Sequence, residues 1–166
     1  MRANGLFTLV YSQNAKVTAT TVLVAVESAQ VREGLVAILG AIDGFRVVAE
    51  ADSDAAAVAA ARAHRPLLAL VELELSGSGG FWAIRQIESE QLATVVVALG
   101  RRANARLAKM VGAQSYIQMG TSPRDVLRTL ESALAYRAKL PSAAQAEHEL
   151  MPDAHAVLDE PALVDL

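Results

Sequence analysis

Short apolar runs of strand length alternate with segments of helical periodicity from about residue 19 to residue 139. Each kind of segment occurs five times, and this alternation is typical of a parallel sheet whose strands are connected through crossover helices. We therefore predict an α/β fold: a doubly wound, flavodoxin-like sheet of five parallel strands in the order 2-1-3-4-5, with helices on both faces.

The first expected strand is rich in β-branched residues. The third is apolar without interruption up to Glu72, as expected when helices cover both faces of a sheet. The five strands are predicted over residues 20–26, 45–50, 67–73, 94–99 and 114–118. The helices are predicted after Ser28, at Ser53, after the glycine-rich loop 76–80, over 102–111, and after Ser122.

The fourth helix is expected to divide its side chains between two faces. The residues expected in the core are Leu107, Met110 and Val111. The residues expected to share an exposed face, at positions i, i+4 and i+7, are Arg102, Arg106 and Lys109. This basic face is open to two interpretations, a solvated surface or a docking patch for an acidic partner, the acidic tail of the same chain included.

Composition excludes several classes of protein. The chain has 166 residues and no cysteine, so it contains no disulfide, no thiol nucleophile and no thiolate metal site. Its apolar runs are far shorter than the roughly 18 residues that a membrane span requires. The first residues do not have the pattern of a secretory signal, so we expect a cytoplasmic protein that does not associate with a membrane.

Charge is distributed unevenly. Residues 141–166 contain six acidic residues and no lysine or arginine, whereas the other 140 residues carry 15 basic and 12 acidic groups. We expect three parts: an N-terminal extension over 1–18 (an edge strand or disordered), one domain over 19–140, and an acidic C-terminal tail over 141–166. The weak positive charge of the domain does not argue for nucleic-acid binding.

Several stretches of the domain occur in the order of landmarks in a known family. They are VLVAVES and VREGL (22–28 and 31–35), GFRVVAEA (44–51), Arg65-Pro66, and Gly112-Ala113 leading through Tyr116 to Ser122-Pro123. They resemble response-regulator receiver domains, most of all those that precede a LuxR-type helix-turn-helix, and the resemblance covers roughly residues 20–138. It implies a receiver-like domain in bacterial signalling or transcriptional control, and not an enzyme.

The resemblance also implies a phosphorylation pocket, from which this chain departs. The family uses an acidic pair for Mg²⁺, an aspartate that accepts phosphate, a hydroxyl residue and a lysine. The corresponding positions here are, in that order, Val26 and Glu27, Glu72, Leu99 or Gly100, and Met119. Phosphoryl transfer depends on positioning and charge neutralisation, which these side chains do not supply. We predict a degenerate pocket without a metal or cofactor, with a weak ion site at Glu27 and Glu72 as the alternative.

Two functional hypotheses follow. The first is a phosphorylation-independent receiver that acts as a protein-binding or dimerisation module. The second is a small-molecule sensor whose emptied apolar pocket is lined by Val26, Met119 and Leu99. Glu72 itself has two interpretations: a permanent mimic of phosphorylated aspartate, or an acid at a strand end that is exposed to water.

The resemblance suggests where partners bind, because receivers use helices 1 and 5, or helices 4 and 5 with strand 5, for dimer and partner contacts. The exposed candidates here are Arg102, Arg106, Lys109, Arg128 and Tyr136. Nothing that resembles a LuxR-type recognition domain follows Lys139, so we expect no direct nucleic-acid binding by this chain.

Overall fold

The computed structural model describes residues 19–139 except 94 and 103. The strands are β1 (Thr20–Ala25), β2 (Phe45–Ala51), β3 (Leu68–Glu72), β4 (Val95–Gly100) and β5 (Ser115–Gln118). The helices are α1 (Ala29–Gly40), α2 (Asp54–His64), α3 (Gly80–Ser89), α4 (Ala105–Met110) and α5 (Pro123–Ala138). The predicted extension over 1–18 and the predicted acidic tail over 141–166 lie outside the described residues.

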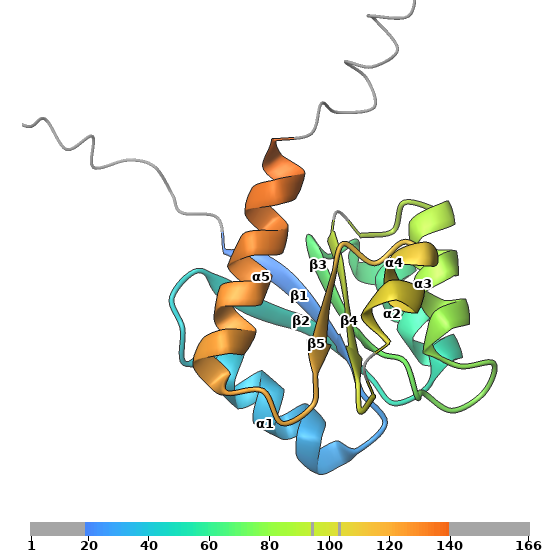
Figure 1. The fold of residues 1–166 in the computed structure, drawn as a ribbon, viewed down its shortest axis with the longest axis horizontal. Helices are drawn as coiled ribbons and strands as arrows, with labels where there is room; N and C mark the ends of the chain where they lie inside the picture. Colours follow the sequence, from blue (N-terminus) through green and yellow to red (C-terminus); the bar gives the residue numbers. More distant parts are fainter. Residues whose placement is uncertain (1–18, 94, 103, 140–166) are drawn as a thin grey trace, which may run out of the picture.

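The five strands form one parallel sheet in the order β2-β1-β3-β4-β5, which confirms the predicted doubly wound topology. Figure 1 shows α1 and α5 on one face of the sheet and α2, α3 and α4 on the other. Because the strands are parallel, their C-terminal ends meet at one edge of the sheet. The residues that follow β1, β3 and β4 are therefore neighbours in space, although they are far apart in the sequence.

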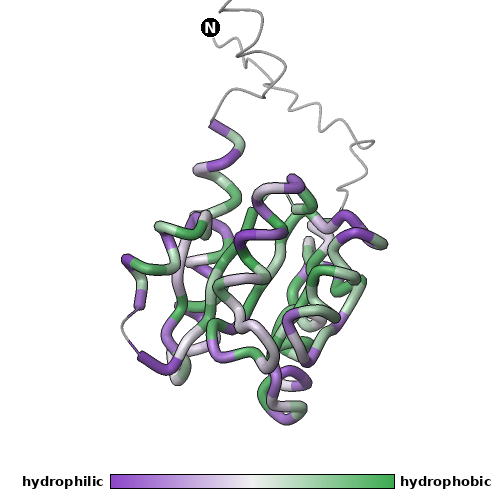
Figure 2. The backbone as a smooth tube through the Cα atoms, turned by 90° about the vertical axis from the view of Figure 1, so that its right-hand side faces the viewer, coloured by the Kyte–Doolittle hydropathy of each residue, from purple (hydrophilic) through white to green (hydrophobic). Residues whose placement is uncertain are grey.

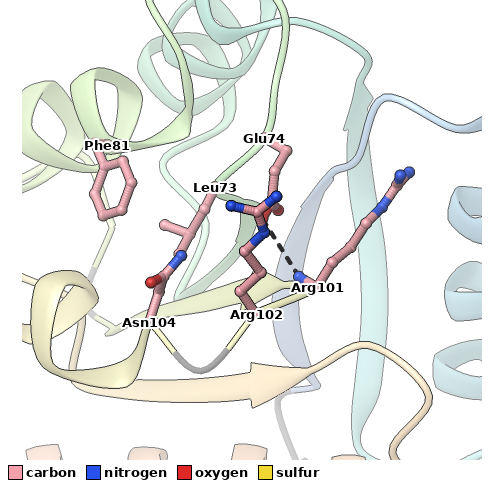
Figure 3. Close-up of a pocket in the computed structure, with 6 residues that line it drawn as sticks. All are labelled: Leu73, Glu74, Phe81, Arg101, Arg102 and Asn104. Atoms are coloured by element: carbon pink, nitrogen blue, oxygen red, sulfur yellow. Dashed lines mark hydrogen bonds between the residues drawn. The ribbon is translucent and has the colours of Figure 1, made fainter.

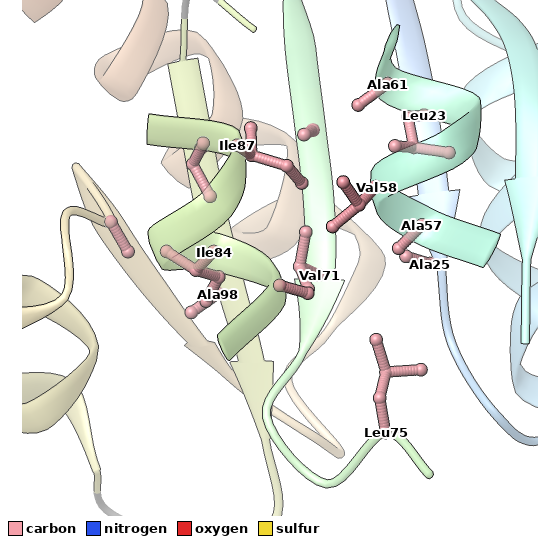
Figure 4. Packing of buried hydrophobic residues seen from close by; sticks show 14 of the residues in the cluster. Leu23, Ala25, Ala57, Val58, Ala61, Val71, Leu75, Ile84, Ile87 and Ala98 are labelled. Atoms are coloured by element: carbon pink, nitrogen blue, oxygen red, sulfur yellow. The ribbon is translucent and has the colours of Figure 1, made fainter. Parts of the chain in front are cut away.

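The centre of the sheet is buried on both faces. All five residues of β3 are buried, as the uninterrupted apolar run predicts. Alternate side chains enter two core clusters. One, shown in Figure 4, packs Val71 against Val58 of α2 and Ile84 of α3. The other packs Leu70 against Leu130 of α5. In Figure 2, hydrophilic stretches lie mainly on the outer turns.

The helix ends follow the local signals in the sequence. Ser122 caps α5, since its Oγ accepts a hydrogen bond from the Asp125 backbone N–H at 3.2 Å and donates to Asp125 Oδ2 at 2.8 Å. Pro123 occupies the first turn, where its missing N–H costs nothing. At its other end, α2 stops at His64, two residues before Pro66.

The fourth helix differs from the prediction. It begins at Ala105, so Arg102 precedes the helix and does not share a helical face with Arg106 and Lys109. The side chain that faces the sheet is the small Ala108, which is fully buried. The larger Leu107 and Met110 remain 49% and 73% exposed, so the prediction that they lie in the core is wrong. A short helix covers only a narrow strip of the sheet, and alanine lets it approach closely.

Within the described part of the chain, no helix has both the length and the apolar composition needed to cross a membrane.

Candidate functional site

Glu72, the last residue of β3, is buried at the C-terminal edge of the sheet. It is 1% exposed, and its Oε2 accepts a hydrogen bond from the backbone N–H of Glu27 at 2.8 Å. The interpretation of Glu72 as an acid exposed to water is therefore wrong. Because β1 and β3 are parallel neighbours, the glutamate side chain reaches the first free N–H beyond the end of β1.

The two residues after β1 have different surroundings. Val26 is fully buried and belongs to the core cluster beneath α1 and α5, whereas Glu27 is exposed. Arg32 of α1 donates from Nη1 to the carbonyl oxygens of Val26 at 2.7 Å and Glu27 at 3.3 Å. Its Nε donates to Glu50 Oε2 at 3.3 Å. The carbonyl oxygens after β1 thus bind the guanidinium group of Arg32, a cation that the protein itself supplies.

The residues around Glu72 are poor ligands for a divalent ion. Within residues 19–139, leaving out 94 and 103, no three His, Cys, Asp or Glu side chains gather as a metal site would require. Mg²⁺ prefers six oxygen ligands in octahedral geometry. At the ends of β1 and β3, one carboxylate is exposed and the other is already hydrogen-bonded to a backbone N–H.

The end of β4 is shaped by a glycine and a tyrosine. Leu99 pairs with Glu72 across the sheet and is buried, and Gly100 is the last residue of the strand. A Cβ on Gly100 would lie 2.7 Å from the hydroxyl oxygen of Tyr116 on β5, which is too close. The Tyr116 hydroxyl donates to the carbonyl of Arg102 and so fastens β5 to the β4–α4 segment.

From the sequence, Tyr116 was identified only as one of the residues that resemble the receiver family. The spacing of residues along the chain does not predict that its hydroxyl lies beside Gly100 at the end of β4. The one available signal was Gly100, which together with Leu99 was a candidate for the position where receivers are expected to carry a hydroxyl side chain. The missing side chain at Gly100 leaves room for the phenol of Tyr116.

We expect Tyr116 to ionise only above the ordinary range of a phenol. Burial raises the pKa of Tyr116, and the negative charge of Glu74 raises it further, although a hydrogen bond to the backbone opposes both. Since the folded state favours the neutral phenol, this contribution to stability is complete below the unfolded pKa of about 10 and is lost as pH rises through the folded pKa. Ultraviolet difference titration of the wild type against Tyr116→Phe measures it. If the absorbance difference between the wild type and Tyr116→Phe changed at or below the ordinary pKa of a phenol, the prediction would be contradicted.

Met119 follows β5 and is half-buried against the core cluster beneath α1 and α5. Together with Leu99 it lines an apolar cavity of about 160 Å³. The other lining residues come from α1, β5, the β5–α5 connection and α5: Val31, Leu35, Ile38, Ile117, Gln118, Gly120, Thr121 and Val126. The predicted apolar pocket thus includes Leu99 and Met119, but Val26 does not line it because its side chain is inside the core.

The predicted partner-binding residues are all exposed. They are Arg102, Arg106, Lys109, Arg128 and Tyr136. Arg128 forms an ion pair with Asp125 one turn earlier in α5, and Tyr136 is 60% exposed near the end of that helix. They come from α4, α5 and the segment before α4, which flank the edge strand β5.

The sequence matches the family model of the response regulator receiver domain over residues 22–131. This chain belongs to that family. Receiver domains act through protein partners or by forming dimers, within two-component signalling and transcriptional regulation. This family and the sheet order agree with the resemblance that the sequence motifs suggested.

Two kinds of curated relative are similar to this receiver. It is 29% identical over 116 residues to the "Transcriptional regulatory protein PdtaR" of Mycobacterium tuberculosis, covering 69% of this chain and 56% of that protein. It is 30% identical over 105 residues to a "Putative transcriptional regulator" of Pseudomonas aeruginosa, covering 61% of this chain and 51% of that one. The chain therefore spans about half the length of the curated relatives it matches.

Solved receiver domains share the fold. The signal receiver domain of the putative response regulator NarL from Mycobacterium tuberculosis aligns with a TM-score of 0.66 at 23% identity, covering 70% of this chain and 97% of that one. The BeF₃-activated receiver domain of RstA from Klebsiella pneumoniae aligns with a TM-score of 0.63 at 26% identity, covering 69% and 97%.

Proposed function

We propose that this receiver is a phosphorylation-independent module that acts by binding a protein partner or a second copy of itself, and not as an enzyme. The observation that carries the proposal is the state of Glu72. At the position of the phosphate-accepting aspartate, this carboxylate is 1% exposed and hydrogen-bonded to the Glu27 N–H. A nucleophile that is shielded in this way is badly placed to attack a phosphodonor.

The other positions of the pocket support the same conclusion. The side chain of Val26 offers no ligand for Mg²⁺, neither Leu99 nor Gly100 has a hydroxyl group, and Met119 has no positive charge. Arg32 already donates hydrogen bonds to the carbonyl oxygens of Val26 and Glu27 after β1. Phosphoryl transfer relies on a metal and cations placed around the reacting oxygens, and these residues cannot provide them.

The decisive test is chemical phosphorylation. We expect the full chain, incubated with acetyl phosphate and Mg²⁺, to show no mass increase of a phosphoryl group by intact mass spectrometry. A receiver that retains its aspartate and lysine serves as the positive control. A phosphoryl adduct on the wild type that disappears in Glu72→Gln would contradict the proposal.

The surface formed by α4, β5 and α5 supports a binding role. It exposes large apolar side chains, with Leu107 at 49%, Met110 at 73% and Tyr136 at 60%, beside basic side chains of α4. Within the described residues β5 is also an edge strand, because β4 is the one strand that pairs with it. Exposed aromatic and apolar groups of this kind are typical of residues that contribute most to protein interfaces.

Sedimentation equilibrium of the full chain without a phosphodonor tests this surface. If two copies associate through it, Tyr136→Ala should weaken association by about tenfold or more, as expected for an aromatic interface residue. The matched control is Arg85→Glu, an exposed position on α3 outside the surface. Equal association of Tyr136→Ala and the wild type would exclude Tyr136 from the interface.

The apolar cavity between α1 and α5 favours a second candidate function, the sensing of a small molecule. Its volume of about 160 Å³ is close to that of engineered apolar cavities that bind benzene. Leu99 and Met119 lie at two of the degenerate positions, so the substitutions there contribute to its apolar lining. A thermal-shift screen with short aliphatic and aromatic ligands, compared with Met119→Lys, separates this role from protein binding.

A further inference from the structure

A second and larger cleft lies on the opposite face of the sheet, between α3 and the segment that connects β4 to α4. Its volume is about 470 Å³, which is within the range of sites for small organic ligands. Its walls combine an aromatic ring, an aliphatic side chain, one carboxylate, one amide and two guanidinium groups. The six lining residues, drawn in Figure 3, are Leu73, Glu74, Phe81, Arg101, Arg102 and Asn104.

The positive charge of this cleft is not neutralised by close ion pairs. Among the described residues, neither Arg101 nor Arg102 has a carboxylate oxygen within 4.0 Å. In Figure 3 the Arg102 side chain turns towards Glu74, whereas Arg101 extends away from Phe81. Two guanidinium groups and one carboxylate leave a net charge of +1 on the lining, so the cleft favours an anion.

The backbone that carries the arginines is held in place. The Arg102 carbonyl accepts hydrogen bonds from the Tyr116 hydroxyl and from the Asn104 N–H, the latter at 2.7 Å. The Arg101 N–H donates to Glu74 Oε1 at 3.4 Å. The side chains therefore remain available for a ligand while their attachment points are anchored, which lowers the entropic cost of binding.

We propose that this cleft binds a small aromatic ligand that carries a phosphate group, of the nucleoside monophosphate class. Arg102 can bind phosphate oxygens in bidentate geometry, with Arg101 at the rim. Phe81, which is half-buried, keeps part of its ring accessible for stacking against a base. Glu74 and Asn104 can accept hydrogen bonds from an exocyclic amino group of that base. The cleft borders the degenerate pocket, since Leu73 follows Glu72 and Arg101 follows Gly100, but none of the pocket positions lines it. The proposal does not depend on the proposed function.

The test is a titration of the full chain with 5′-AMP, followed by amide chemical shifts in NMR spectra and by calorimetry. We expect the amides of Leu73, Phe81 and Asn104 to shift in a saturable way. Arg102→Gln should weaken AMP binding by about tenfold or more, since hydrogen bonds to charged groups contribute about 1.5 to 3 kcal/mol. This variant retains the backbone carbonyl that accepts the Tyr116 hydrogen bond.

Control ligands and variants make each outcome decisive. Arg106→Gln removes an exposed arginine of α4 that does not line the cleft and should bind AMP like the wild type. Phe81→Leu should weaken binding of AMP but not of inorganic phosphate. Absence of shifts at the cleft amides with millimolar AMP would overturn the proposal. So would equal affinities of Arg102→Gln and Arg106→Gln, or inorganic phosphate binding as tightly as AMP.

Discussion

Replacing Gly80 with alanine is expected to lower the free energy of unfolding by about 3 kcal/mol, because an added methyl group has no room there. A Cβ on Gly80 would lie 1.9 Å from the carbonyl oxygen of Glu72 and 2.7 Å from the Cα of Leu73. Both contacts are with backbone, which cannot move aside as a flexible side chain can. The first turn of α3 would be pushed away from the end of β3, where Glu72 is held. Chemical denaturation followed by circular dichroism measures the change.

Gly34→Ala is the matched control for this substitution. Gly34 lies within α1, is exposed, and has nothing within 4 Å of the position of an added Cβ. Alanine there should raise the free energy of unfolding by about 0.5 to 1 kcal/mol, since glycine loses more conformational freedom in a helix. The two substitutions should therefore change stability in opposite directions. A Gly80→Ala variant as stable as the wild type would show that α3 does not pack on β3 as described.

Leu130→Ala is expected to lower the free energy of unfolding by about 3 kcal/mol, as removal of a large buried side chain leaves a cavity. Leu130 is fully buried in the core cluster beneath α5, where it packs with residues of the central strands. Chemical denaturation of Leu130→Ala and the wild type measures this difference in the free energy of unfolding.

Leu107→Ala is the same chemical change at an exposed position. Leu107 lies on α4 and is 49% exposed, so its replacement should change stability by no more than about 0.5 kcal/mol. The pair tests the orientation of α4, because the sequence had placed Leu107 in the core. A loss at Leu107 as large as that at Leu130 would restore that interpretation and would remove Leu107 from the proposed binding surface.

Most of the framework could be predicted from the sequence, because the signals that specify it are local. Strand and helix periodicity predicted five alternating units, and the order 2-1-3-4-5 that such units commonly adopt is the one observed. Ser122, Pro123 and Asp125 marked the start of α5 correctly, since a helix cap depends on residues three apart in the chain. The family motifs were sufficient to identify a receiver domain.

The sequence-based predictions were wrong where the burial of a side chain depends on residues that are distant in the chain. Both Ala108 and Leu107 suit the periodicity of a helix, and only the proximity of the sheet decides that the smaller one faces inward. The burial of Glu72 depends on an N–H 45 residues away that no local pattern reveals. The same is true of the cleft, because Phe81 and Arg102 line one cleft only when α3 packs beside the end of β4.

Periodicity and residue identity are properties of the chain, so they were enough to predict the architecture and to predict a pocket in which Val26 and Met119 stand where receivers are expected to carry an acid and a lysine. Packing in three dimensions decided the surroundings of the side chains at the strand ends: Glu72 is shielded, Arg32 binds the carbonyl oxygens after β1, and Tyr116 lies beside Gly100. These arrangements depend on distances between strand ends. Such distances exist only once parallel pairing brings those ends to one edge of the sheet.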